Sequence, residues 1–419
     1  MREMKDSGVK WIGEIPSSWN VMPNKYLMKK KKVICPVYNG EDILSLTMKG
    51  VIVRDLDAGG KMPTSFDGYQ RLEPGNLLMC LFDIDVTPRC IGLIKQAGLS
   101  SPAYSQFTLN DIANAEYYCY YYTMLDNDKT LLHLAKNLRH SLTEDQLGAI
   151  STIVPPIEEQ KRIADFLDAK CTEIDALTAD IRTQIDTLEQ YKCSVITEAV
   201  TKGLNPDAEM KDSGNQYWGN IPTNWHLSDI KYLFEIVKRI AGREGYDILS
   251  VTQKGLKVKD ISNNEGQIAE SYANYQFVYP GDFVMNHMDL LTGWVDCSEL
   301  FGVTSPDYRV FRLRDRNNNL NYYKYIMQTC YMNRIFYSLG QGVSNLGRWR
   351  LQTSSFNNFM VPVPPVEEQE RIADYLDKKC AKIDICIDDK EKQLEILSEY
   401  KKSLIYEYVT GKKEVPANA

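Results

Sequence analysis

The sequence predicts an α+β protein: two globular mixed α/β bodies joined by two long coiled-coil helices, in a pseudo-twofold and nearly circular arrangement. Three observations predict this fold class. A tryptophan-containing segment near the start of the chain returns in the middle, a proline-opened helical segment also occurs twice, and each copy of the pair encloses a body of about 130 residues. With 419 residues, the chain has room for two or three domains.

The opening segments are the first repeat. Met4–Trp19 and Met210–Trp225 share Met-Lys-Asp-Ser-Gly at the start and Ile-Pro before the final Trp, at a constant offset of 206. Solenoid repeats have periods of roughly 20–50 residues, so this repeat is a duplicated domain rather than a solenoid unit.

The helical segments are the second repeat. Pro155–Asp168 returns as Pro364–Asp377, at an offset of 209. Proline is tolerated in the first turn of a helix, and the Glu-Glu pair that follows suits a helix N-terminus. Neither Pro nor Gly interrupts residues 157–202 or 366–410, so we expect two helices of roughly 65 Å.

Apolar residues follow each proline pair at heptad spacing, which is typical of a coiled coil. The obvious partner of each helix is the other copy, although two unrelated amphipathic surface helices would show a similar stripe. The residues that we expect to pack the helix pair are Ile174, Leu177, Ile181, Leu188, Tyr191, Val195, Ile383, Ile387, Leu394, Leu397, Tyr400 and Leu404.

These repeats predict the domain boundaries and the layout. The expected segments are a first body (1–154), a central helix (155–206), a second body (207–363), and a C-terminal helix and tail (364–419). By the internal symmetry, the second helix should finish close to the N-terminus. A circular permutant opened near residue 203 should therefore fold.

The bodies carry short strand patterns at matching places. Residues 42–47 and 247–252 are expected strands, and residues 74–79 and 280–285 read as a turn followed by a strand. The tyrosine-rich stretches beginning at Tyr117 and Tyr322 fit either a strand–helix edge or a helix.

Composition limits the classes of protein that fit. No apolar run approaches the ~20 residues that span a bilayer, and the polar N-terminus does not resemble a signal peptide. The ten cysteines are scattered, as in a cytoplasmic protein. The net charge is −7, but both bodies are neutral, with 17 basic and 17 acidic residues in 1–154 and 16 of each in 207–363. Local basic surface for nucleic acid is therefore still possible.

Motifs for catalysis are weak. No convincing nucleophile–base pair, paired carboxylates or metal-ligand spacing occurs, so we predict no catalytic residue and no metal site. Ser101–Tyr104 and Ser305–Tyr308 are Ser-Pro-x-Tyr motifs that faintly resemble the base-holding loop of amino-methyltransferases, but they lack its second proline. We favour a turn with a packed tyrosine.

Basic, amide and aromatic residues interleave in both bodies, where they could contact phosphates and base edges. Each could instead be a solvated surface residue. The candidate DNA-binding residues are Lys49, Arg54, Tyr69, Arg71, Asn137, Arg139, His140, Lys254, Lys257, Lys259, Gln276, Gln341, Asn345, Arg348 and Arg350.

The duplicated Trp/Tyr-x-Gly-x-Ile-Pro-x-x-Trp and Pro-Pro-x-x-Glu-Gln-x-Arg-Ile-Ala-x-x-Leu-Asp motifs, over nearly the whole chain, resemble the specificity (S) subunit of type I restriction–modification enzymes. The resemblance implies that each body is a target-recognition domain for one half of a bipartite site in double-stranded DNA. It also implies an antiparallel helix pair that sets the spacing between half-sites and docks two methyltransferase (M) subunits.

The same resemblance implies further partners and places the cofactors elsewhere. Restriction (R) subunits would join the complex, S-adenosylmethionine would bind the M subunits, and ATP with Mg²⁺ would bind the R subunits. A rival interpretation is a duplicated coiled-coil adaptor that binds proteins rather than DNA. A self-contained nuclease or methyltransferase is disfavoured because cofactor and metal motifs are missing.

Overall fold

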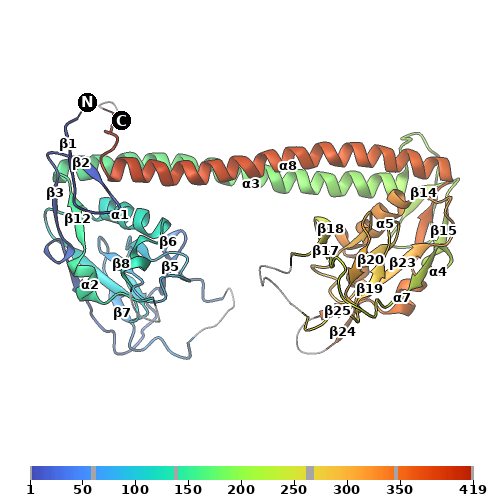
Figure 1. The fold of residues 1–419 in the computed structure, drawn as a ribbon, viewed down its shortest axis with the longest axis horizontal. Helices are drawn as coiled ribbons and strands as arrows, with labels where there is room; N and C mark the ends of the chain where they lie inside the picture. The colour runs from blue at the N-terminus through green and yellow to red at the C-terminus, as the bar shows by residue number, and fades with distance from the viewer. Residues whose placement is uncertain (1, 58–62, 136–139, 261–268, 344–347, 417–419) are drawn as a thin grey trace. The chain divides into compact units, whose positions relative to one another are not determined.

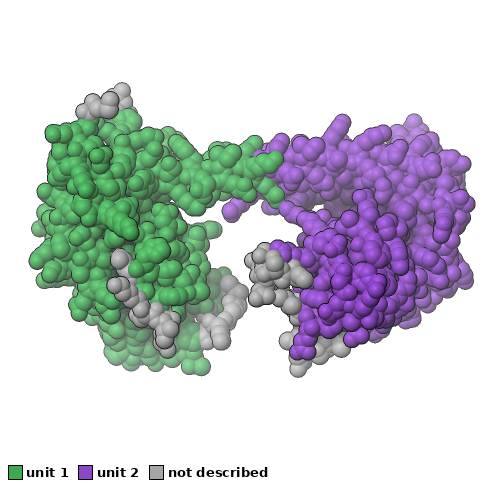
Figure 2. Space-filling view, in the orientation of Figure 1, with its two compact units in different colours: residues 1–181, 391–419 green, residues 182–390 purple. Residues whose placement is uncertain are grey.

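The computed structural model describes residues 2–57, 63–135, 140–260, 269–343 and 348–416. The chain forms two compact units: unit 1 comprises residues 1–181 and 391–419, and unit 2 comprises residues 182–390 (Figure 2). Each unit contains one body and part of each long helix.

The body of unit 1 is built on a four-stranded antiparallel sheet in the order β4-β11-β8-β9. Helix α1 lies against strand β9, at one edge of this sheet (Figure 1). In chain order the elements are β1 (Met4–Asp6), β2 (Glu14–Pro16), β3 (Asn20–Pro23), η1 (Asn24–Tyr26), β4 (Met28–Lys31), β5 (Leu44–Thr47), β6 (Gly50–Val53), β7 (Gln70–Leu72), β8 (Leu77–Met79), β9 (Ile91–Leu93), β10 (Gly98–Ser100), β11 (Ser105–Leu109), α1 (Ala115–Asn127), η2 (Thr130–Leu134), α2 (Glu144–Ala149) and β12 (Ser151–Val154).

The body of unit 2 repeats this order around the sheet β16-β23-β20-β21, with the hairpin β24–β25 in addition. Its elements are β13 (Met210–Asp212), β14 (Asn220–Pro222), β15 (His226–Asp229), α4 (Ile230–Leu233), β16 (Phe234–Val237), β17 (Leu249–Thr252), β18 (Gly255–Val258), β19 (Gln276–Val278), β20 (Phe283–Met285), β21 (Val295–Cys297), β22 (Gly302–Thr304), β23 (Arg309–Leu313), α5 (Leu320–Met332), α6 (Ile335–Ser338), β24 (Gln341–Val343), β25 (Arg348–Arg350), α7 (Thr353–Asn357) and β26 (Met360–Val363).

The tyrosine-rich stretches are helices, α1 and α5, and not strand edges. Tyrosine rings from both helices pack in the cores of the bodies, and several of their hydroxyls donate to backbone carbonyls. Tyr117 donates to the carbonyl of Val409 at 2.8 Å, and Tyr322 donates to that of Pro362 at 3.2 Å. These hydrogen bonds satisfy the buried hydroxyls and help to fix the orientation of each helix in its body.

The two proline-opened segments form the long helices α3 (Ile157–Lys202) and α8 (Val366–Val409), which confirms that prediction. In unit 1, Lys401 Nζ lies 2.6 Å from Asp175 Oδ1, and in unit 2, Lys192 Nζ lies 2.6 Å from Asp384 Oδ1. From the first pair to the second, the residue number on α3 rises by 17 and that on α8 falls by 17. The two helices therefore run antiparallel, and both ion pairs fit the same alignment of one helix on the other.

The end of each long helix packs on an opening segment. A Cβ added at Gly411, after α8, would lie 2.6 Å from Pro16 and 2.8 Å from Trp19. One added at Gly203, after α3, would lie 3.4 Å from Trp225. Both glycines have positive φ angles, +72° and +74°, which glycine adopts without strain. The end of α8 is thus close to the N-terminal segment, as the repeat predicted.

Candidate nucleic-acid interface

Two matching hairpins carry predicted lysines at their turns. Thr47 Oγ1 accepts the backbone N–H of Lys49 at 3.1 Å, and Thr252 Oγ1 accepts that of Lys254 at 3.2 Å. Both lysines are exposed, as is Lys257 on β18. The threonine fixes each turn through its side chain, so a lysine backbone is held at the same point in both units.

Other basic candidates are engaged with the protein surface. Arg71 is half-exposed and pairs with Glu41 at 3.2 Å. The pKa of Glu41 is below its usual value, first because the backbone N–H of Asn39 donates to it, and further because Arg71 lies beside it. Tyr69 packs edge-on against Phe66, with ring centroids 5.3 Å apart. Arg54 and Lys259 are partly buried.

Gln276 was predicted to contact DNA, but the structure gives it a different place. The residue is 2% exposed, and its amide donates to the carbonyls of Ser305 and Tyr308 at 2.9 and 2.8 Å. In unit 1, Gln70 makes the same two bonds to the Ser-Pro-Ala-Tyr motif. The prediction was wrong because a polar side chain next to a turn satisfied backbone carbonyls instead of facing solvent.

The remaining candidates come late in the sequence of each body. His140 pairs with Asp85 at 2.8 Å, and this hydrogen bond lowers the pKa of the Asp85 carboxyl. Gln341 is exposed on β24, and Arg350 is half-buried at the end of β25. Asn137, Arg139 and Asn345 lie outside the described residues, as does the side chain of Arg348.

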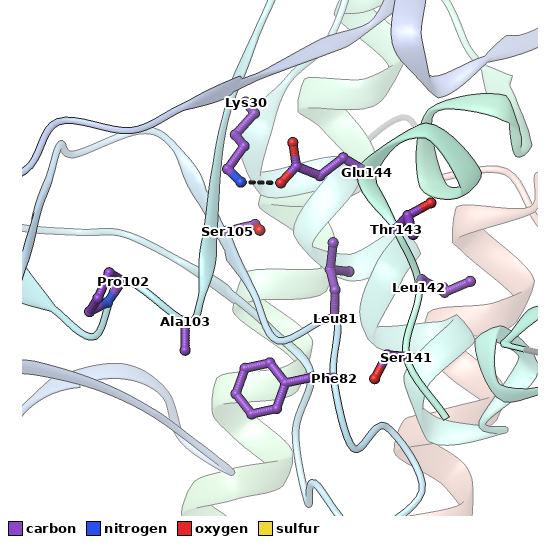
Figure 3. Close-up of a pocket in the computed structure, with 10 residues that line it drawn as sticks. All are labelled: Lys30, Leu81, Phe82, Pro102, Ala103, Ser105, Ser141, Leu142, Thr143 and Glu144. Carbon is purple, nitrogen blue, oxygen red and sulfur yellow. Dashed lines mark hydrogen bonds and ion pairs between the residues drawn. The ribbon is translucent and has the colours of Figure 1, made fainter. Parts of the chain in front are cut away.

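A hollow of about 450 Å³ opens beside the central sheet of unit 1 (Figure 3). Lys30 and Glu144 form an ion pair on one side of it, and Phe82 lies on the opposite side. The other lining residues are Leu81, Pro102, Ala103, Ser105, Ser141, Leu142 and Thr143. The lining carries hydroxyls and one balanced charge pair, which gives the hollow no excess of positive charge.

The matching place in unit 2 holds residues that the sequence reasoning missed, His287 and Arg309. Arg309 follows the Ser-Pro-Asp-Tyr motif directly, where the first copy has Ser105. Aligning the two copies residue by residue would have shown the change from a hydroxyl to a guanidinium. Neither residue stands in a charge run, so the pattern of basic clusters along the sequence does not point to them.

The predicted packing residues of the helices divide into three groups: buried, partly buried and exposed. Ile174, Ile181, Ile383 and Leu404 are buried. The partly buried ones are Leu188, Val195, Ile387, Leu394 and Leu397.

Leu177, Tyr191 and Tyr400 are corrections, because they are 47%, 46% and 54% exposed. An antiparallel pair of straight helices buries only a narrow stripe, and these positions lie at its margin. Tyr191 still meets the other helix, since Lys379 Nζ lies 5.3 Å from the centre of its ring.

Two residues of the repeated helix motif hold the body on the helix. Gln160 Oε1 accepts the N–H of Asn114, the N-cap of α1, at 2.8 Å, and Gln369 Oε1 accepts that of Asn319, the N-cap of α5, at 3.0 Å. Both glutamines are buried. The motif therefore fixes the start of the tyrosine-rich helix in each unit.

The aspartate that ends the motif makes a second such contact. Tyr120 donates to Asp168 at 2.5 Å, and Tyr325 donates to Asp377 at 2.7 Å. Burial and the neighbouring carboxylate both raise the pKa of each tyrosine well above its usual value, so both hydroxyls stay protonated donors.

Along the described part of the chain, no helix is both long and apolar enough to cross a membrane. The same residues include no group of three or more His, Cys, Asp or Glu side chains placed to hold a metal ion.

Two curated relatives come from Methanocaldococcus jannaschii. The putative type I restriction enzyme MjaX specificity subunit is 25% identical over 66% of this chain and 62% of its own length. The type I restriction enzyme MjaVIII specificity subunit is 26% identical over 62% of each. The chain thus spans somewhat under two thirds of the length of these relatives.

A solved structure shares the fold. It comes from work described as the structural basis of complex assembly and conformational transition of the type I R-M system. It covers 95% of this chain and 99% of its own, with a TM-score of 0.67 at 14% identity. The family model for the type I restriction modification DNA specificity domain matches residues 100–187 and 222–395, more than half of the sequence. The chain therefore belongs to the type I restriction–modification DNA specificity family.

Proposed function

We propose that this chain is the DNA-recognition subunit of a type I restriction–modification complex. The body in residues 1–154 would read one half of a bipartite site in double-stranded DNA, and the body in 207–363 would read the other. The observation that carries the proposal is one fold present twice, with the same helix contacts but different side chains at matching surface positions. Two specificities on one scaffold require that combination.

The long helices α3 and α8 would dock two methyltransferase subunits and set the spacing between half-sites. Restriction subunits would join this complex. S-adenosylmethionine would then bind the methyltransferase subunits, and ATP with Mg²⁺ the restriction subunits, so the chain itself would contribute recognition and no catalytic group. The acidic helix segments suit protein contacts better than contacts with phosphate.

The direct test is methylome sequencing of a host with and without this chain, followed by gel shifts with the methyltransferase subunits present. We expect one bipartite methylated motif that depends on the chain, and binding that weakens steeply with salt. A protein adaptor would give neither a motif nor sequence-specific retardation.

The spacing role has a test of its own. Inserting four residues, about one helical turn, within 178–186 should change the preferred gap between half-sites or abolish specific binding. An insertion at the exposed loop Asp315–Asn317 is the matched control and should leave the gap unchanged. If the insertion in the helix leaves the methylated motif as it was, the helices do not set the spacing.

A further inference from the structure

The sheet register shows that Ser105 and Arg309 occupy the same place in the two bodies. Ser105 on β11 lies opposite Met79 on β8, and Arg309 on β23 lies opposite Met285 on β20. The strand orders of the two sheets are equivalent. Ser105 lines the hollow of unit 1, so Arg309 marks the matching place in unit 2.

Backbone hydrogen bonds match two further positions. Leu142 N–H donates to the carbonyl of Leu81 at 2.8 Å, and Leu351 N–H donates to that of His287 at 3.0 Å. The residue before each of these donors is Ser141 in unit 1 and Arg350 in unit 2. Three residues that line the hollow of unit 1 are thus replaced at the matching positions of unit 2: Leu81 by His287, Ser105 by Arg309 and Ser141 by Arg350.

Arg309 is buried at this place and makes only neutral contacts. It is 4% exposed, and its guanidinium donates to the carbonyl of Leu351 at 3.1 Å and to Thr353 Oγ1 at 3.3 Å. The guanidinium also lies 4.5 Å from the ring centre of Phe356. Among the described residues, no carboxylate pairs with it. Burying a cation without an opposite charge is costly, so a bound anion would stabilise this arrangement.

His287 and Arg350 lie close enough to this guanidinium for their charges to act on one another. The imidazole Nδ1 is shielded from solvent and has no hydrogen-bond partner in the described structure. Burial first, and then the charges of Arg309 and Arg350, lower the pKa of His287 to about 3. Arg350 likewise has no ion pair among the residues described. Asp289 lies close to Tyr331, as Arg309 does, but accepts bonds from the N–H groups of its own turn.

We infer that His287, Arg309 and Arg350 form an anion-binding site that takes a phosphate of the DNA backbone, and that the matching hollow in unit 1 lacks this contact. The partly exposed side chains of Arg350 and His287 would contact the phosphate, and buried Arg309 would add its positive charge from the interior of the body. A guanidinium is suited to phosphate oxygens, and its hydrogen bonds to an anion are stronger than those to neutral groups. The inference rests on the proposed function for the source of the phosphate.

The first experiment tests the site without DNA. Inorganic phosphate is added to the full chain, and the histidine ring signals are followed by NMR between pH 4 and 7, with those of His287 assigned by their loss in His287→Leu. We expect phosphate to raise the pKa of His287 by at least one unit, because an anion offsets the two guanidinium charges. The signals of exposed His226 should not shift. Unchanged titration of His287 in saturating phosphate would overturn the site, whatever the chain does with DNA.

The second experiment identifies the phosphate as that of DNA. Arg350→Ser places the unit 1 residue in unit 2, and exposed Arg316→Ser is the matched control. With methyltransferase subunits present, Arg350→Ser should weaken binding about 10-fold and reduce the slope of log K against log salt by about 1, equally for all sequences. A loss confined to one base pair would mean a base contact and overturn the phosphate assignment, as would an unchanged slope. Absence of specific binding by the unchanged chain would instead contradict the proposed function.

Discussion

The two units hold their bodies on the long helices in the same way but differ in the hollow beside the central sheet. Gln160 accepts the N–H of the N-cap residue of α1, and Gln369 accepts that of the N-cap residue of α5. At one matched position, however, unit 1 has Ser105 beside an open hollow and unit 2 has the buried guanidinium of Arg309. The two units have therefore kept the contacts that fix each body and differ in the side chains of the proposed phosphate site. The following predictions test whether the shared contacts are equivalent and the changed ones are not.

The glutamine that holds the Ser-Pro-x-Tyr turn should be equally important in both units. Removing the amide in Gln276→Ala leaves two buried carbonyls unpaired, and we expect a loss of about 3 kcal/mol in the free energy of unfolding. Gln70→Ala should cost about the same. Hydrogen exchange followed by mass spectrometry measures each unit separately. A loss in one unit much larger than in the other would show that the two turns are not equivalent.

The tryptophans of the opening segments should differ, although both are buried. Trp19 Nε1 donates to Glu159 at 2.9 Å, whereas Trp225 Nε1 is shielded and has no partner in the described structure. Glu368, the residue that matches Glu159, accepts a bond from Asn224 instead. Replacing either Trp by Phe removes a similar amount of packing, but only the substitution at Trp19 also removes a hydrogen bond. We expect Trp19→Phe to cost about 2 kcal/mol more than Trp225→Phe in thermal or urea unfolding.

Equal losses would mean that the bond from Trp19 to Glu159 contributes nothing beyond packing. Arg2 also pairs with Glu159, at 2.5 Å, and could compensate for the missing indole. Repeating the measurement with Arg2→Ala separates the two partners of that carboxylate.

Much of the fold could be predicted because the repeated segments and the helical periodicity are visible in the sequence itself. The start of α3 at Ile157 follows from the proline pair, and the end of α8 near the N-terminus follows from the symmetry of the repeat. The candidate site was harder, because residue type alone does not reveal burial. Gln276 has an amide that can pair with base edges, yet it is buried and bonds to a turn, while Arg309 stands in no basic cluster of the sequence, yet it is a buried cation. Both depend on strand register, which places a side chain on one face of the sheet or the other.

The smallest expected effect concerns the pH dependence of stability in unit 2. Because folding lowers the pKa of His287 to about 3, the unfolded chain takes up a proton below its ordinary pKa of about 6.5 while the folded chain does not. The stability that this histidine contributes is present above pH 6.5 and is lost as the pH falls toward 3. His287→Leu carries the unit 1 residue, which cannot titrate. Between pH 7 and pH 5 the unchanged chain should lose about 1 kcal/mol more than this variant, a value reduced for the partial exposure of the ring. Urea unfolding at both pH values measures the difference, with His226→Leu as the exposed control. Parallel losses in the unchanged chain and His287→Leu would mean that neither burial nor the two guanidinium groups lower the pKa of this imidazole on folding.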